Sequence, residues 1–227
     1  GVAEKQAQII VCENNFHGRT TTIISFSNDE NARKNFGPFT DGFIKIPYDD
    51  IAALEKAITS SPNIAGFLVE PIQGEAGVYV PSEDYLAKAK ALCAANNVLF
   101  IADEVQTGIA RTGSLLAVCG NCTCEKSCEK QASYVQPDIL ILGKAISGGA
   151  YPVSAVLAND EIMNVIKPGQ HGSTFGGNYL VTTAALEVLD ILEEIKDSGE
   201  LDETIIYFNK KLNEIYENNK ELFTNNV

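Results

Sequence analysis

The sequence is poor in cationic side chains. It has 17 Lys and Arg residues against 30 Asp and Glu residues, which gives a formal net charge of −13 at pH 7. Binding to the phosphates of a nucleic acid needs clustered Lys and Arg side chains, and the sequence contains no basic run. We therefore expect no nucleic acid as a partner.

Long hydrophobic runs are also lacking. The longest ones, Val98–Ala102 and Ile139–Leu142, are far shorter than the roughly 20 apolar residues that a membrane-spanning helix requires, so we expect no membrane partner. The first residues do not show the basic start and apolar segment of a secretory signal. We expect an intracellular protein, located in the cytoplasm rather than in the mitochondrial matrix.

Histidine is scarce. The two histidines, His17 and His171, are too few for a histidine-based zinc site, and neither has a second histidine one helical turn away. We predict no metal ion in the functional site. What the sequence does contain is 45% hydrophobic residues over 227 positions, which is enough to bury a core without disulfides or metals.

Short apolar runs alternate with helix-like segments over residues 1–180. This alternation predicts an α/β fold with three layers, αβα, and a mainly parallel sheet. Strands are predicted at residues 64–69, 98–102, 139–142 and 153–158. Because 98–102 and 139–142 are apolar at every position, we expect both faces of these strands to be covered.

Helix start signals accompany these strands. Asp49-Asp50 is predicted to cap a helix that runs through Ile58, and Ser82 is predicted to cap a helix that ends at Asn96-Asn97. Beyond Leu180 the pattern is helical only, with an apolar stripe at Leu201, Ile205, Phe208, Leu212 and Ile215. We therefore assign residues 1–180 to a large domain and residues 181–227 to a helical segment that leads toward a smaller C-terminal domain.

Polar residues follow three of the predicted strands. Glu70 follows 65–69, Asp103 follows 99–102, and Lys144 follows 139–143. Ligands of open α/β sheets bind beyond the carboxyl ends of the strands. A lysine and a carboxylate at neighbouring strand ends suit pyridoxal phosphate, whose aldehyde forms a Schiff base with lysine and whose ring nitrogen is kept protonated by an acid. The alternative is that Asp103 only caps the next segment and Lys144 is a solvated loop residue.

Five segments resemble, in order and in spacing, the signatures of the class III pyridoxal-phosphate aminotransferases. They are Phe16–Thr20 (FHGRT), Val69–Gly77 (VEPIQGEAG), Ala102–Gly108 (ADEVQTG), Leu142–Gly149 (LGKAISGG) and His171–Asn178 (HGSTFGGN). Within this class, residues 151–157 and 166–174 are most similar to the ornithine aminotransferases. The resemblance covers residues 8 to 195 and implies the large domain of a transferase of the aspartate aminotransferase type (fold type I), incomplete at both ends.

The resemblance implies roles for five residues around the cofactor ring. Lys144 would carry the Schiff base and move the proton, and Asp103 would hold the pyridine nitrogen. Gln106 would contact the phenolic oxygen. Phe16 and Val105 would lie on the two faces of the ring, although Phe16 could instead be an ordinary core aromatic residue.

Three further cofactor residues are implied by the resemblance. His17 would be a cofactor-binding neighbour of the ring. Thr174, together with Ser173, would reach the cofactor phosphate in the other subunit of a homodimer, so that the active site would be shared.

Substrate-binding roles are implied for Arg19, Glu70 and Glu75. Arg19 would bind the α-carboxylate of ornithine, and Glu75 would neutralise an arginine of the C-terminal domain until a dicarboxylate binds. The residues alone leave two alternatives open, namely that Arg19 forms a surface ion pair and that Glu70 or Glu75 serves only backbone donors.

The activity implied by the resemblance is transfer of the δ-amino group of L-ornithine to 2-oxoglutarate, which gives glutamate-5-semialdehyde and glutamate. The alternatives are an acetylornithine or 4-aminobutyrate aminotransferase and a non-catalytic, truncated aminotransferase-like subunit. The sequence departs from the class in lacking the Gly-rich phosphate-binding turn and the small domain, which we expect upstream of Gly1 and beyond Val227. Tyr179 also stands where Pro is common.

Four cysteines fall within ten residues, at Cys119, Cys122, Cys124 and Cys128. Their spacing is tighter than that of the separated pairs of zinc ribbons. Three interpretations remain: a metal site built from thiolates, a reversible disulfide served by a thioredoxin-type partner, and inert surface thiols. In each case we expect an exposed loop remote from the cofactor.

Overall fold

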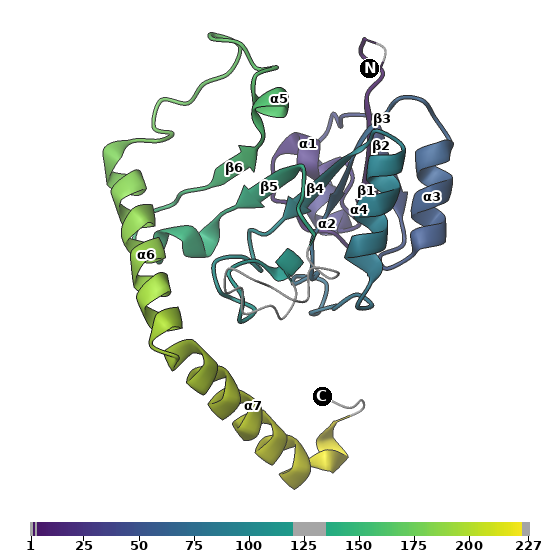
Figure 1. Ribbon diagram of the computed structural model, residues 1–227. Helices are drawn as coiled ribbons and strands as arrows, with labels where there is room; N and C mark the ends of the chain where they lie inside the picture. The colour runs from purple at the N-terminus through teal and green to yellow at the C-terminus, as the bar shows by residue number, and fades with distance from the viewer. Residues whose placement is uncertain (1, 3, 120–134, 224–227) are drawn as a thin grey trace.

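A computed structural model describes residues 2, 4–119 and 135–223 of the chain. A six-stranded sheet forms its centre (Figure 1). In spatial order the strands are β2 (Phe43–Ile46), β1 (Gln8–Cys12), β3 (Ile64–Val69), β4 (Leu99–Asp103), β5 (Ile139–Leu142) and β6 (Ala155–Ala158). The first five are parallel, and β6 is antiparallel to β5. The predicted α/β fold with a mainly parallel sheet is confirmed.

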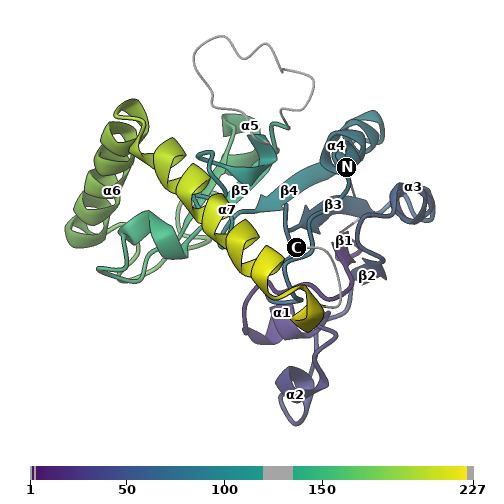
Figure 2. The ribbon, with the colours of Figure 1, turned by 90° about the horizontal axis from the view of Figure 1, so that it is seen from below.

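Helices lie on both faces of this sheet (Figure 2). The helices α3 (Ile51–Thr59) and α4 (Tyr85–Ala95) cover one face, where Leu54 and Ala89 pack with Phe67 and Phe100. On the other face, Phe26 packs with Val11 and Leu68 just after the short helix α1 (Thr21–Ile24), and α2 (Glu30–Arg33) follows. The three layers are therefore α3 with α4, the sheet, and the α1 segment.

The expectation that β4 and β5 are covered on both faces holds for one face of β4, and β5 is mostly half-buried. Phe100 and Ala102 are fully buried beneath α3 and α4. On the opposite face Ile101 and Ile141 are half-buried. The reason is that α1 has only four residues, so it covers little of the apolar surface that these strands present on that side.

One predicted helix cap is confirmed and the other is wrong. The carboxylate of Asp50 accepts the backbone N–H of Ala53 at 2.8 Å, as expected for the N-cap of α3. Ser82 does not cap α4, which begins at Tyr85 after Asp84. The hydroxyl and backbone N–H of Ser82 both donate to the Asp49 carboxylate, at 2.6 and 3.0 Å, so this side chain holds a loop contact instead.

The C-terminal part of the chain is helical. It contains α5 (Asp160–Met163), α6 (Tyr179–Asp197), α7 (Glu200–Asn218) and a short 3-10 turn, η4 (Lys220–Leu222). Two more 3-10 turns, η1 (Ala117–Cys119) and η3 (Lys144–Ser147), lie in the large domain. None of the helices within residues 4–119 and 135–223 is long and apolar enough to span a membrane.

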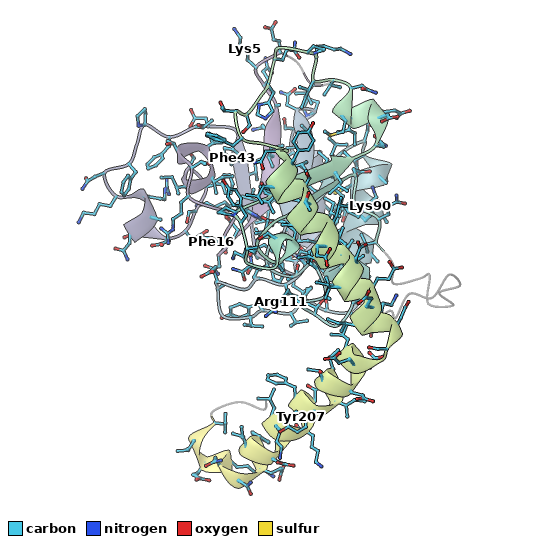
Figure 3. All side chains as sticks on the ribbon, turned by 90° about the vertical axis from the view of Figure 1, so that its left-hand side faces the viewer. Lys5, Phe16, Phe43, Lys90, Arg111 and Tyr207 are labelled. Carbon is cyan, nitrogen blue, oxygen red and sulfur yellow. The ribbon has the colours of Figure 1, made fainter. Side chains whose placement is uncertain are left out.

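Helix α6 packs on η3, whereas α7 extends away from the sheet (Figure 1). Tyr207 on α7 accordingly lies far from Phe16 in the α/β domain (Figure 3). The apolar stripe predicted beyond Leu180 does lie on one helix, but its central residue Phe208 is 60% exposed. The division of the chain at residue 180 stays a prediction.

The cap of α3 provides a test of the local fold. Asp50→Ala should lower the free energy of unfolding by about 1 kcal/mol, because it leaves the N–H of Ala53 without its acceptor. Asp84→Ala is the matched control, since Asp84 makes no side-chain cap bond, and it should change stability much less. Chemical denaturation of the three proteins measures the difference, and equal losses would contradict this account of the cap.

Candidate active site

The carboxyl ends of four parallel strands meet at one edge of the sheet. Phe16 and His17 follow β1, Glu70 follows β3, Asp103 ends β4, and Lys144 follows β5 after one glycine. A cavity of about 170 Å³ opens at this edge. It is lined by Phe16, His17, Gly18, Glu70, Ile72, Asp103, Val105, Gln106 and Lys144. The structure thus brings together every predicted site residue except Arg19, Glu75, Ser173 and Thr174.

Asp103 is held by two hydrogen bonds. It is 7% exposed, and its Oδ1 accepts the backbone N–H of Val105 at 3.0 Å. Its Oδ2 lies 2.6 Å from Nδ1 of His17, and Nδ1–H is the donor because a carboxylate only accepts. The other ring nitrogen of His17, Nε2, is buried and has no hydrogen-bond partner among the described residues. The side chain of Asp103 is therefore held in a fixed orientation at the cavity.

Glu70 is a second buried acid in the same cavity. It is 6% exposed, and its Oε2 accepts the backbone N–H of Phe16 at 3.1 Å. Burial raises the pKa of this carboxyl to about 7, against the weaker opposing effect of His17. One alternative from the sequence was that Glu70 or Glu75 serves only a backbone donor. Glu70 does bind the N–H of Phe16, but its side chain also lines the cavity.

Lys144 begins the short turn η3 in the left-handed backbone region, with φ of 46°. Its side chain is exposed and lines the cavity that Asp103 also lines. The Nζ atom makes no hydrogen bond or ion pair with the residues that the structure describes. An amine without a partner at a cavity mouth is available to a ligand, and the cofactor role of Lys144 stays a prediction.

Gln106 and Glu75 form a contact between two loops. Nε2 of Gln106 donates to Oε1 of Glu75 at 2.8 Å. A Cβ atom on Gly74 would lie 1.9 Å from Oε1 of Gln106, so this approach requires glycine at position 74. The predicted arginine partner of Glu75 stays a prediction.

Arg19 and Glu75 line a second cavity of about 350 Å³ that shares Phe16, His17 and Gly18 with the first. The guanidinium of Arg19 lies 5.5 Å from the centroid of the Phe16 ring, within the range of a cation–π contact. Arg19 makes no ion pair in the described part of the chain. Its exposed side chain is therefore accessible from the cavity, and its role in binding a substrate carboxylate stays a prediction.

Ser173 and Thr174 are exposed on the loop between α5 and α6, and neither lines the two cavities. The hydroxyl oxygen of Ser173 accepts the N–H of Gly176 at 3.0 Å. The sequence predicts that both residues contact the cofactor of another subunit. The structure describes one chain, so this contact stays a prediction.

Sequence analysis assigned no role to Glu104, which is the most buried acid among the described residues. It is 1% exposed and accepts the hydroxyl of Thr107 and the N–H groups of Ala117 and Val118. Burial raises the pKa of this carboxyl. Glu104 follows Asp103 directly, so it fixes the strand end that carries Asp103; the only sequence signal was a second acid after an apolar strand.

The cysteine cluster cannot be placed. Cys122, Cys124 and Cys128 lie outside the described residues, so the three interpretations stay open. Cys12 and Cys93 are free, buried thiols. Burial raises the pKa of each thiol to about 12, and the two thiols are therefore unreactive. Within the described ranges, no three His, Cys, Asp or Glu side chains are grouped so that they could hold a metal ion.

This edge-of-sheet site and this fold are those of the class-III aminotransferases. The chain matches the aminotransferase class-III family over residues 1–225, and it belongs to this family. Among its relatives, it is 56% identical over 195 residues to "Ornithine aminotransferase, mitochondrial" of Drosophila ananassae, an alignment that covers 86% of this chain and 42% of that protein. The chain spans about half the length of the curated relatives it matches.

Solved structures give the same result. The ornithine aminotransferase of Toxoplasma gondii, in which pyridoxal phosphate partially occupies the active site, has a TM-score of 0.78 at 48% identity, over 88% of this chain and 43% of that one. Acetylornithine aminotransferase from Elizabethkingia anophelis has a TM-score of 0.75 at 57% identity. The alignment covers 96% of this chain and 50% of that one. Plasmodium falciparum ornithine δ-aminotransferase has a TM-score of 0.68 at 46% identity, over 86% of this chain and 42% of that one. This structure is described in terms of redox regulation. The family resemblance seen in the sequence is confirmed.

The raised pKa of Glu70 predicts a pH dependence of stability. The folded state binds the proton of this carboxyl up to about pH 7, whereas the unfolded state releases it near 4.5. The stability that Glu70 contributes is therefore complete below pH 4.5 and is lost as the pH rises through 7. Glu70→Gln, which keeps an acceptor for Phe16, should remove this part of the pH dependence.

Thermal unfolding of both proteins between pH 4 and pH 8 measures the effect. Glu83→Gln is the control, because Glu83 is an exposed carboxylate that lines neither cavity, and this variant should retain the slope of the wild type. Parallel curves for Glu70→Gln and the wild type would show that burial does not perturb Glu70.

Gly74→Ala tests the contact between Gln106 and Glu75. The new methyl group would overlap the Gln106 amide, which is the end of a flexible side chain and can move away. We expect little change in melting temperature but loss of the Gln106–Glu75 hydrogen bond, visible in a crystal structure. Gly172→Ala is the control, because a Cβ there meets nothing within 4 Å. An unmoved Gln106 amide would refute the prediction.

Proposed function

We propose that this protein is a pyridoxal-phosphate-dependent aminotransferase that moves the δ-amino group of L-ornithine to 2-oxoglutarate, giving glutamate-5-semialdehyde and glutamate. The observation that carries the proposal is that the unpartnered amine of Lys144 and the carboxylate of Asp103 line the same cavity. Family membership and the names of relatives from Drosophila and Toxoplasma support it.

The donor set at the cavity fits pyridoxal phosphate. Lys144 offers an amine for the covalent bond to the aldehyde, and the oriented carboxylate of Asp103 suits a protonated ring nitrogen. Phe16 and Val105 offer apolar surface for a flat ring. When bound, pyridoxal phosphate supplies an electron sink that stabilises negative charge on the substrate carbon.

The residues of this chain then have distinct tasks. Lys144 Nζ would hold the cofactor aldehyde covalently and would also serve as the base that takes and returns the substrate proton. His17 donates to Asp103 and so keeps its carboxylate oriented. Arg19 binds the α-carboxylate of ornithine in the larger cavity, so that the δ-amine points toward Lys144. Glu75 lines this larger cavity, and Glu70 lines the smaller one.

One observation favours a second candidate. The acetylornithine aminotransferase of Elizabethkingia anophelis is 57% identical over 96% of this chain, a longer match than that of the Toxoplasma enzyme. Comparison of kcat/KM for ornithine, N-acetylornithine and 4-aminobutyrate decides between these activities. A free α-amine must be preferred over the acetylated one if the proposal is right.

The proposal includes the assembly and the surroundings of the protein. A homodimer would place Ser173 and Thr174 of each subunit at the cofactor phosphate of the other, and sedimentation at micromolar concentration tests it. An intracellular location, in the cytoplasm rather than the mitochondrial matrix, belongs to the proposal. A thioredoxin-type partner at Cys119, Cys122, Cys124 and Cys128 is proposed as well, with support from the redox regulation described for the Plasmodium enzyme.

Lys144→Ala tests the proposed function. We expect the wild type to bind pyridoxal phosphate with an absorbance band at the edge of the visible range and, after borohydride reduction, to carry the cofactor on the Lys144 peptide in mass spectra. The variant should show no covalent label and no transamination, because it loses anchor and base together.

Lys45→Ala, which changes an exposed lysine on β2, is the control and should be labelled like the wild type. Labelling of the Lys144→Ala protein to the wild-type extent would refute the assignment. A wild type that takes up no label would instead support a non-catalytic aminotransferase-like subunit.

A further inference from the structure

Tyr48 contacts the active-site loop without lining either cavity. It lies between β2 and α3, and its hydroxyl donates to the backbone carbonyls of Glu70 and Pro71, at 3.1 and 2.9 Å. Its ring packs edge-on against the fully buried ring of Tyr85, with centroids 5.6 Å apart. The phenol is thus fixed by packing while its hydroxyl reaches the first residues after β3.

The next link in the chain of contacts is Glu70 itself. While Tyr48 holds its carbonyl, the Glu70 carboxylate accepts the N–H of Phe16 at 3.1 Å. Phe16 lines both cavities, and Arg19 lies over its ring. Two consecutive contacts therefore connect a tyrosine outside the site to the aromatic ring inside it.

We propose that Tyr48 is a positioning residue that fixes Glu70 and, through Glu70, the ring of Phe16 against the cofactor. The identity of the ligand rests on the proposed function, but the positioning of Phe16 does not. Burial raises the pKa of the Tyr48 phenol, which keeps its hydroxyl a donor throughout the working pH range.

Tyr48→Phe removes the hydroxyl alone and keeps the packed ring. Tyr85→Phe is the matched control, because it also removes one tyrosine hydroxyl from the same ring pair. That hydroxyl contacts the thiol of Cys12 at 3.9 Å and the backbone of Asp49, and not the Glu70 turn. We expect Tyr48→Phe to weaken pyridoxal phosphate binding about tenfold, the worth of one hydrogen bond, and to reduce the circular dichroism of the bound cofactor. Tyr85→Phe should leave both unchanged.

A readout that needs no cofactor accompanies these measurements. Amide hydrogen exchange of the peptide that contains Phe16 should speed up in Tyr48→Phe and not in Tyr85→Phe, because only the former loosens the acceptor of the Phe16 N–H. This readout tests the inference even if the wild type binds no pyridoxal phosphate, an outcome that would count against the proposed function alone.

A double variant tests the route through Glu70. Where Glu70→Ala has already removed the acceptor of Phe16, Tyr48→Phe should have little further effect on exchange or on binding. Additive effects would mean that Tyr48 acts by another route and would overturn the inference. So would wild-type exchange at Phe16 in Tyr48→Phe, or equal changes in Tyr48→Phe and Tyr85→Phe.

Discussion

Parallel pairing of β1, β3, β4 and β5 is the constraint on which the site depends. Parallel strands end at the same edge of a sheet, so their last residues are brought together whatever their distance in sequence. The register places Val69 beside Ala102 and Asp103 beside Ile141. A slip of one residue would turn Asp103 toward the opposite face and remove it from the cavity.

The two acids of the small cavity differ because their environments differ. Asp103 accepts hydrogen bonds from both His17 and the N–H of Val105, and these fix the orientation of its carboxylate. Glu70 receives one hydrogen bond, and burial dominates, so its pKa rises to about 7. The cavity therefore combines one acid of fixed orientation with a second acid that takes up or releases a proton near neutral pH.

What the sequence predicted well were features decided by neighbouring residues. Strands β3 and β5 were predicted at their observed bounds, because each is an apolar run with a polar residue or a glycine directly after it. The positions of Lys144 and Asp103 at neighbouring strand ends were predicted for the same reason. Ser82 was assigned wrongly because Asp49, 33 positions away, binds its hydroxyl and N–H, and no local pattern announces such a contact.

Tyr48 was missed for the same reason, and its turn shows how far the site depends on residues outside it. Three consecutive residues after β2 each bind a different segment. Tyr48 donates to the backbone directly after β3, and Asp49 accepts the hydroxyl of Ser82. Asp50 caps the start of α3. Asp49 adopts φ of 62°, a left-handed conformation that Asp tolerates and that turns successive side chains in different directions. The loop held in this way carries Glu75 to Gln106. One turn that lines neither cavity is thereby connected, through the Glu70 loop, to Phe16, which lines both.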